Sequence, residues 1–317
     1  MRKVSSRKRG ERMKLALCLP GGGACGRWQT GVLKYLYDMG MFKHVELVCG
    51  TSVGGLNTLL VGKYRDNFEK GVELWERIKS NKDIYNGMLQ FNNVFDFFGM
   101  IGQIFKSNKG KSVLDPVGLY QILDREFGNM ALRDLKVPVI ITTTDLSKGE
   151  RLIFSTENNP DYKCAELGRC TSAIPLAFPA VELYIDNKKD LCVDGGLGRN
   201  NPVEVAIEAG ATHIILIGTS PDIYPRKEVK NGVIDVALRI QDIIMRIFEE
   251  EAWEEKEYRE KLSQYDAVKY PPIKILDIYP DTDTGSALDF SNVTQLDAGK
   301  KYARENCPME ALDIFLK

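Results

Sequence analysis

The sequence is poor in histidine and has no long hydrophobic run. Only two of its 317 residues are histidine, His44 and His213, and no Cys/His spacing typical of a zinc site occurs. Mechanisms that need an imidazole therefore have few candidates. No apolar run reaches the roughly 18 residues that a membrane-spanning helix needs, which excludes an integral membrane protein.

Cysteine is present, but its pattern does not indicate disulfide bonds. The seven cysteines are an odd number, and several lie inside apolar, strand-like runs. This is typical of buried, reduced thiols, so we expect a reducing compartment and a cytoplasmic location. With 44% hydrophobic and 27% charged residues, the composition is that of a globular protein.

The net charge of −1 conceals a basic N-terminal segment. Residues 1–14 contain seven Lys or Arg and one Glu, a charge of +6, so the remainder carries −7. We expect residues 1–13 to be a disordered, solubilising tail; peripheral contact with anionic lipid is the alternative, and a nucleic-acid partner is not expected. The apolar run Leu15–Leu19 is too short for the core of a signal peptide and favours a first buried strand.

Short apolar runs alternate with helical patterns along the chain. The expected strands are 14–20, 44–49, 137–144, 151–155, 191–193 and 213–217, and helical spacing occurs over 31–39 and 56–64. This alternation predicts an α/β fold whose mostly parallel sheet is covered on both faces. No repeat or low-complexity linker interrupts residues 14–317, which favours a single domain.

Two segments stand apart from this pattern. The first is residues 86–110, in which the stretch 88–105 holds five of the thirteen phenylalanines. This segment is either an aromatic flap, which would bind lipid or cap an acyl pocket, or a loop whose aromatic side chains pack into the core. Residues 234–265 predict a long amphipathic helix whose distal half is acidic. We expect its apolar face to pack on the sheet and its acidic end to be solvated; a partner-binding role is the alternative.

The sequence Gly50-Thr51-Ser52-Val53-Gly54 forms a G-x-S-x-G motif between a predicted strand and a predicted helix. This is the context of a nucleophile elbow. The turn is so tight that Gly50 and Gly54 must lack side chains, and Ser52 then projects at the positive end of the following helix. Ser52 is therefore the candidate nucleophile.

Three glycines, Gly21 to Gly23, follow the first predicted strand and precede a helix. Their backbone N–H groups are candidate donors to an oxyanion, and Arg27 could add positive field nearby. The same glycines, with Gly26, also fit the dinucleotide-binding pattern G-x-G-x-x-G. That alternative needs a carboxylate at the end of the second strand, where Cys49 and its neighbours stand instead.

The candidate base is Asp194, which leaves a predicted strand and precedes Gly195 and Gly196. A carboxylate there can accept the serine proton at neutral pH. His213 begins a buried strand, and His44 is about five residues of strand away from Ser52, which is too far for proton transfer. A serine–aspartate pair without histidine remains.

Taken together, PGGGACGRWQTG, GTSVGG, TSAIPLAFPAV and DGGLGRNNP, in that order, resemble the patatin-like phospholipase family over about residues 13–220. The resemblance implies a three-layer α/β/α fold and a serine–aspartate dyad that acts on acyl esters of lipids. Beyond residue 220 it transfers no function to the C-terminal third.

The resemblance also implies roles for individual residues. Ser52 would be the nucleophile and Asp194 the base, while Gly22, Gly23 and the N–H of Val53 would form the oxyanion hole. The supporting positions are Gly21, Arg27, Gly50, Gly54, Gly195 and Gly196. In the family the loop is often preceded by Asp or Gly, whereas this sequence has Pro20.

These features predict a lipid acyl hydrolase that cleaves phospholipids or lysophospholipids through an acyl-enzyme and needs neither metal nor cofactor. An acyltransferase on the same elbow, with an alcohol or thiol acceptor in place of water, is one alternative. A non-enzymatic nucleotide-binding module is the other. The sequence indicates neither head-group preference nor oligomeric state.

Overall fold

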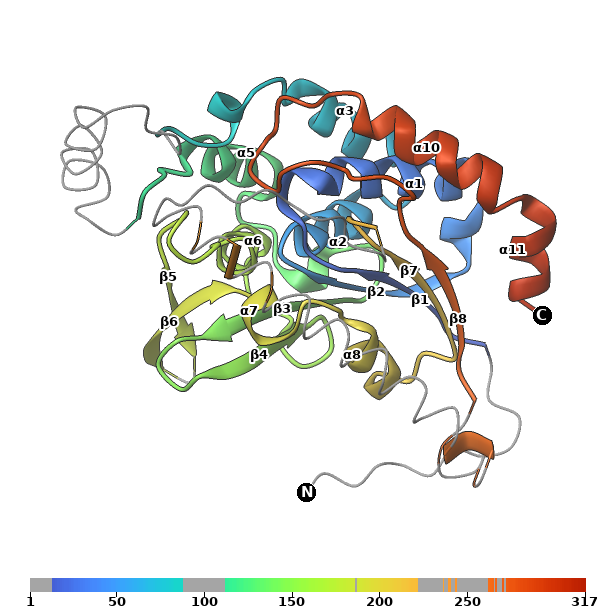
Figure 1. Cartoon of the computed structure of the whole chain (residues 1–317). Helices are drawn as coiled ribbons and strands as arrows, with labels where there is room; N and C mark the ends of the chain where they lie inside the picture. The colour runs from blue at the N-terminus through green and yellow to red at the C-terminus, as the bar shows by residue number, and fades with distance from the viewer. Residues whose placement is uncertain are drawn as a thin grey trace.

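The computed structural model describes residues 13–87, 112–185, 187–221 and 272–317, together with isolated positions between 236 and 270. An eight-stranded mixed sheet forms its centre (Figure 1). The strands are β1 (Leu15–Leu19), β2 (Val45–Thr51), β3 (Val139–Asp145), β4 (Glu150–Ser155), β5 (Val181–Ile185), β6 (Lys188–Asp194), β7 (His213–Ile217) and β8 (Lys274–Ile278).

Five of these strands are parallel, in the order β3-β2-β1-β7-β8, as the alternation of strands and helices predicts. The other three are antiparallel: β4 and β6 both pair with β3, and β5 pairs with β6. The turn from β3 to β4 is short and passes through Gly149, whose φ of +68° is readily adopted only by glycine. The sequence did not indicate this antiparallel corner, or β5 and β8.

Helices cover both faces of the sheet. They are α1 (Gly26–Asp38), α2 (Val53–Tyr64), α3 (Glu69–Arg77), α5 (Val117–Phe127), α6 (Cys164–Thr171), α7 (Gly196–Arg199), α8 (Val203–Glu208), α10 (Gln295–Asn306) and α11 (Met309–Phe315). The helices predicted at 31–39 and 56–64 are confirmed as α1 and α2, although both begin several residues earlier than predicted.

Alternation along the strands explains the three layers. In β1, Leu15, Leu17 and Leu19 join the large core beneath α1, α2 and α3, whereas Ala16 and Cys18 face a second, smaller core beneath α8. Successive side chains of a strand point to opposite faces, so an apolar run without polar alternation must be covered twice. The predicted α/β/α fold is thereby confirmed.

Several predictions concern residues outside the described ranges: the tail 1–12 and the segment 88–111, which includes most of the candidate flap. Of the predicted helix 234–265, only positions 236, 239, 240, 243 and 262–264 are described, and these are helical. In the described part of the chain, no helix combines the length and apolarity required to cross a bilayer. All seven cysteines are free and buried, as expected.

Candidate active site

The sheet brings the ends of two strands together along one edge of β3. The parallel strand β2 ends at Thr51, opposite Thr142 of β3, and the antiparallel strand β6 ends at Asp194, opposite Thr143. Because β4 occupies the other edge of β3, β2 and β6 approach each other head to head along a single edge. The residues that leave these strands therefore meet, although 142 positions separate Ser52 from Asp194.

Ser52 lies in a strained turn between β2 and α2. Its φ of 56° and ψ of −130° are unusual for a residue with a side chain, as expected of a nucleophile elbow. A Cβ on Gly50 would lie 2.3 Å from the carbonyl oxygen of Gly54, and one on Gly54 would lie 1.8 Å from that of Leu19. Neither position has room for a side chain, as the motif predicts.

A short hydrogen bond joins the two candidate catalytic side chains. Ser52 Oγ donates to Asp194 Oδ2 at 2.6 Å, and the N–H of Gly196 donates to Asp194 Oδ1 at 2.8 Å. Asp194 is fully buried, and this burial raises the pKa of its carboxyl to about 7 against the opposing effect of the two hydrogen bonds. A Cβ on Gly195 would lie 2.5 Å from the carbonyl oxygen of Thr142, so β6 leaves the sheet in close contact with β3.

Thr171, at the end of α6, holds the elbow to the sheet. Its hydroxyl accepts a hydrogen bond from the N–H of Ser52 at 2.8 Å and donates one to the carbonyl oxygen of Thr142 at 2.7 Å. All three residues are buried. No role for Thr171 was predicted from the sequence. The one feature that could have indicated its importance is that it begins the TSAIPLAFPAV stretch, which contributes to the family resemblance.

The glycine loop lies directly against Ser52. A Cβ on Gly21 would be 2.6 Å from both Ser52 Cβ and Asn200 Oδ1, so only glycine fits. The N–H of Gly21 donates to Asn200 Oδ1 at 2.9 Å, and its carbonyl oxygen accepts from Thr219 Oγ1 at 2.6 Å. Gly21 is thus occupied in fixing the loop and is no oxyanion donor.

The N–H groups of Gly22, Gly23 and Val53 donate no hydrogen bond within the described residues. Gly23 and Val53 line the same cavity as Ser52. Gly23 has a φ of +56°, and a Cβ there would lie 2.0 Å from the carbonyl oxygen of Ala287. The chain at Ala287, in the C-terminal third, therefore packs on the loop, a contact that the sequence did not indicate.

Arg27 is held by hydrogen bonds to the backbone. Its buried guanidinium donates to the carbonyl oxygens of Trp75, in the last turn of α3, and of Ile78, which directly follows α3. It also donates to the carbonyl oxygen of Asn292 at 3.0 Å. Burial lowers the pKa of this guanidinium. Arg27 therefore secures the end of α3, which forms one wall of the cavity, and none of its described hydrogen bonds is to Ser52.

Buried amides connect α2 with the glycine loop. Asn57 of α2 donates to the carbonyl oxygen of Gly26 at 3.0 Å and to Gln29 Oε1 at 2.8 Å, and it accepts from the indole N–H of Trp75 at 2.9 Å. Gln29 in turn donates to the carbonyl oxygen of Pro20 at 3.3 Å. Because Ser52 directly precedes α2 and Pro20 begins the loop, this network fixes Ser52 relative to the loop.

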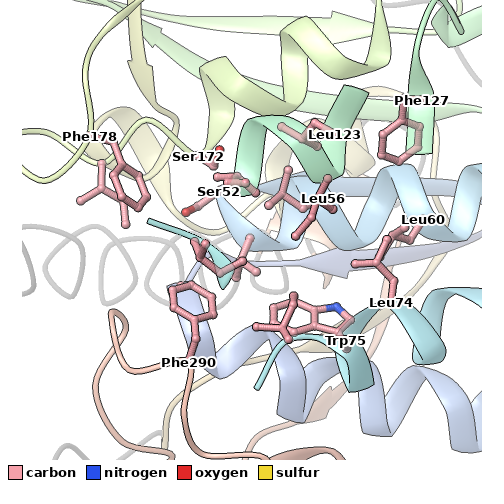
Figure 2. Close-up of a pocket in the computed structure, with 17 residues that line it drawn as sticks. Ser52, Leu56, Leu60, Leu74, Trp75, Leu123, Phe127, Ser172, Phe178 and Phe290 are labelled. Atoms are coloured by element: carbon pink, nitrogen blue, oxygen red, sulfur yellow. The ribbon is translucent and has the colours of Figure 1, made fainter. Parts of the chain in front are cut away.

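An apolar cavity extends from Ser52 between α2, α3 and α5 (Figure 2). Its empty volume is about 670 Å³, including space that is open to solvent. Apart from Ser52 and the neighbouring Gly23 and Ser172, the described residues that line it are apolar: Val53, Leu56, Leu60, Leu74, Trp75, Ile78, Ile84, Leu119, Ile122, Leu123, Phe127, Ile174, Phe178 and Phe290. Such a cavity suits a hydrocarbon chain.

Both histidines lie at the opposite end of the sheet from Ser52. His213 pairs with Leu15 at the start of β1, and His44 precedes β2. The ring of His213 packs edge-on against Phe315. The described part of the chain also contains no group of three or more His, Cys, Asp or Glu side chains arranged to hold a metal ion.

A family model for patatin-like phospholipases matches residues 17–207, which include the glycine loop, the elbow and Asp194. Patatin-like protein 7 of Arabidopsis thaliana is 25% identical over 220 residues, which are 63% of this chain and 42% of that protein. A cGAMP-activated phospholipase of Pseudomonas aeruginosa is 26% identical over 198 residues, 59% of this chain and 53% of that protein. The chain thus spans about half the length of these relatives.

Solved structures show a similar fold. Human GIVD cytosolic phospholipase A2 aligns with a TM-score of 0.50 over 96% of this chain and 63% of that chain, at 10% sequence identity. At that identity the likeness concerns the fold alone.

Proposed function

The chain belongs to the patatin-like phospholipase family, and we propose that it hydrolyses fatty-acyl esters of phospholipids or lysophospholipids with Ser52 as nucleophile and Asp194 as base. The observation that carries this proposal is the 2.6 Å hydrogen bond from Ser52 Oγ to Asp194 Oδ2 at the head of an apolar cavity. A nucleophile within hydrogen-bond reach of its base meets the geometric requirement for activation.

In the first step, Ser52 Oγ attacks the ester carbonyl as its proton passes to Asp194. The oxygen of the tetrahedral intermediate becomes negative, and the N–H groups of Gly22, Gly23 and Val53 are its proposed donors. Each such donor is worth about 3 kcal/mol in the transition state. The carbon–oxygen bond to the alcohol then breaks, and the protonated Asp194 gives its proton to the leaving oxygen.

In the second step, water attacks the acyl-enzyme. Asp194 takes one proton from the water, a second oxyanion forms, and Ser52 leaves with that proton as the fatty acid is released. A carboxyl with a pKa of about 7 suits both roles, because it can accept and release a proton near neutral pH. Since lipid substrates reside in membranes, we expect peripheral contact with a membrane surface during turnover.

Hydrolysis of mixed phospholipid vesicles, with the products identified by mass spectrometry, tests the proposal. Wild type should release fatty acid and lysophospholipid, and Ser52→Ala and Asp194→Asn should each lower the rate by a factor on the order of 1,000 or more. Ser155→Ala and Asp190→Asn are matched controls, because both side chains are buried yet outside the cavity and the dyad.

If Ser52→Ala or Asp194→Asn retains wild-type hydrolysis, the dyad assignment is wrong. Acyl transfer is distinguished in the same assay by adding an alcohol acceptor. Ester products formed at the expense of free fatty acid would identify an acyltransferase on the same elbow.

A further inference from the structure

The cavity beside Ser52 has a far end that its lining residues close. Ser52, Phe178 and Phe290 lie at one end of the cavity, and Leu60, Leu74 and Phe127 lie at the other (Figure 2). The three far-end side chains are buried. An acyl chain that is attached at Ser52 and enters the cavity must therefore stop there.

Phe127 separates the cavity from a charged cluster. It is the last residue of α5, and the chain turns immediately at Gly128, whose φ of +49° favours glycine. Lys63 Nζ lies 5.5 Å from the centre of the Phe127 ring and 3.6 Å from Glu126 Oε2. Lys63 and Glu126 do not line the cavity, so a chain passing the ring would meet charged groups that hydrocarbon cannot solvate.

The length of the cavity follows from the geometry of α2. Ser52, Leu56 and Leu60 succeed one another at four-residue steps, and all three line the cavity. At a rise of about 1.5 Å per residue, Ser52 and Leu60 are ~12 Å apart along the helix. An extended hydrocarbon advances roughly 1.3 Å per carbon, given carbon–carbon bonds near 1.5 Å, so the cavity holds a chain of about ten carbons.

We propose that Phe127, together with Leu60, sets the length of the acyl chain that this enzyme accepts, with an optimum of about ten carbons. This inference rests on the proposed function, since it places the acyl carbonyl at Ser52. Shorter chains leave apolar lining unoccupied and lose burial, whereas longer chains must bend back or leave methylenes outside the cavity.

The test is a series of p-nitrophenyl esters from butyrate to palmitate. In wild type, kcat/KM should rise about three- to fourfold per added methylene up to decanoate and then fall. Phe127→Ala opens the far end and should move the optimum to laurate or myristate. Leu60→Phe fills it and should move the optimum to hexanoate or octanoate.

Phe154→Ala is the matched control, because Phe154 is an equally large buried side chain that packs on Tyr162 and does not line the cavity. It should leave the optimum at decanoate even if it lowers the thermal stability. Opposite shifts from the two cavity variants support the inference. An unchanged optimum in both, with hydrolysis retained, would overturn it while leaving the proposed function intact.

A binding measurement separates this inference from the chemistry. Fatty acids from butyrate to palmitate are titrated against a fluorescent fatty acid bound to the Ser52→Ala variant, with and without Phe127→Ala. Affinity should peak at decanoate and shift to longer chains when the ring is removed. If this shift occurs while wild type hydrolyses no ester, the proposed function fails and the length limit stands; no shift here contradicts the length limit.

Discussion

Under the proposed mechanism, the raised pKa of Asp194 sets the pH dependence of activity. Burial raises the pKa of this carboxyl to about 7. A base acts only when ionised, so kcat/KM for ester hydrolysis should rise with pH through about 7 and level off above it. A pH–rate profile on a soluble ester measures this. A profile that is flat down to about pH 5 would mean that another group with an ordinary carboxyl pKa acts as base.

The same raised pKa predicts how Asp194 affects stability. Because the folded state holds this proton more tightly than the unfolded state, the contribution of Asp194 to stability is greatest at low pH and falls as pH rises from about 4 to about 7. The Asp194→Asn variant cannot ionise at this position, so it does not lose this stability as pH rises. Its free energy of unfolding relative to wild type should therefore increase by about 2–3 kcal/mol between about pH 5 and about pH 8.

Urea denaturation of the two proteins at both pH values checks this prediction. Comparing them removes the contributions of all other titrating groups, which are common to both. A relative stability that does not change with pH, or that falls as pH rises, would show that Asp194 is ionised in the folded protein throughout this range.

At the scale of secondary structure, the elbow depends on α6. Thr171→Val keeps the shape of the side chain but leaves the N–H of Ser52 and the carbonyl of Thr142 without this hydroxyl. We expect a loss of about 2–3 kcal/mol in stability and a fall in kcat of about tenfold or more with little change in KM. Thr171→Ser retains the hydroxyl, so its stability and its kcat should both be close to those of wild type. Equal kcat values for the two variants would exclude a positioning role.

The amide network between α1, α2 and α3 makes a related prediction. Asn57→Leu removes hydrogen bonds to Gly26, Gln29 and Trp75, and should cost about 3–5 kcal/mol and lower kcat. The neighbouring Thr58 has a buried hydroxyl with no partner among the described residues, so Thr58→Val should change stability by less than about 1 kcal/mol. Denaturant unfolding and steady-state kinetics measure both. Similar losses for the two variants would mean that general packing, and not the network, is responsible.

Across the whole molecule, the features that could be predicted from the sequence are the tight turns, whose local geometry fixes the residue types. Tight turns require glycine at fixed spacing, so the elbow at Ser52, the loop at Gly21 and the exit at Asp194 could be recognised, and the family match confirms the resemblance. The arrangement in which β2 and β6 end head to head along one edge of β3 could not be predicted from the sequence. The antiparallel strands β4, β5 and β6 that create it have no distinctive hydrophobic periodicity.

Residues that act through distant contacts also escaped prediction. Thr171 reaches Ser52 across 119 positions, and Asn200 reaches Gly21 across 179. Threonine and asparagine are common in turns, so their types alone do not indicate these contacts. The backbone contacts of Arg27 were likewise not predicted: its nearness to the loop in sequence suggested a positive field on an oxyanion, and its buried guanidinium also bonds carbonyl oxygens of distant segments.

In the proposed mechanism, Asp194 activates Ser52 directly, without histidine. The most direct measurement is the rate of covalent labelling by a fluorophosphonate, with the modified residue located by peptide mass spectrometry. Wild type should carry a single adduct on Ser52, and Asp194→Asn should slow its formation by a factor on the order of 100 or more. An adduct on another residue, or an equal labelling rate in Asp194→Asn, would contradict the account.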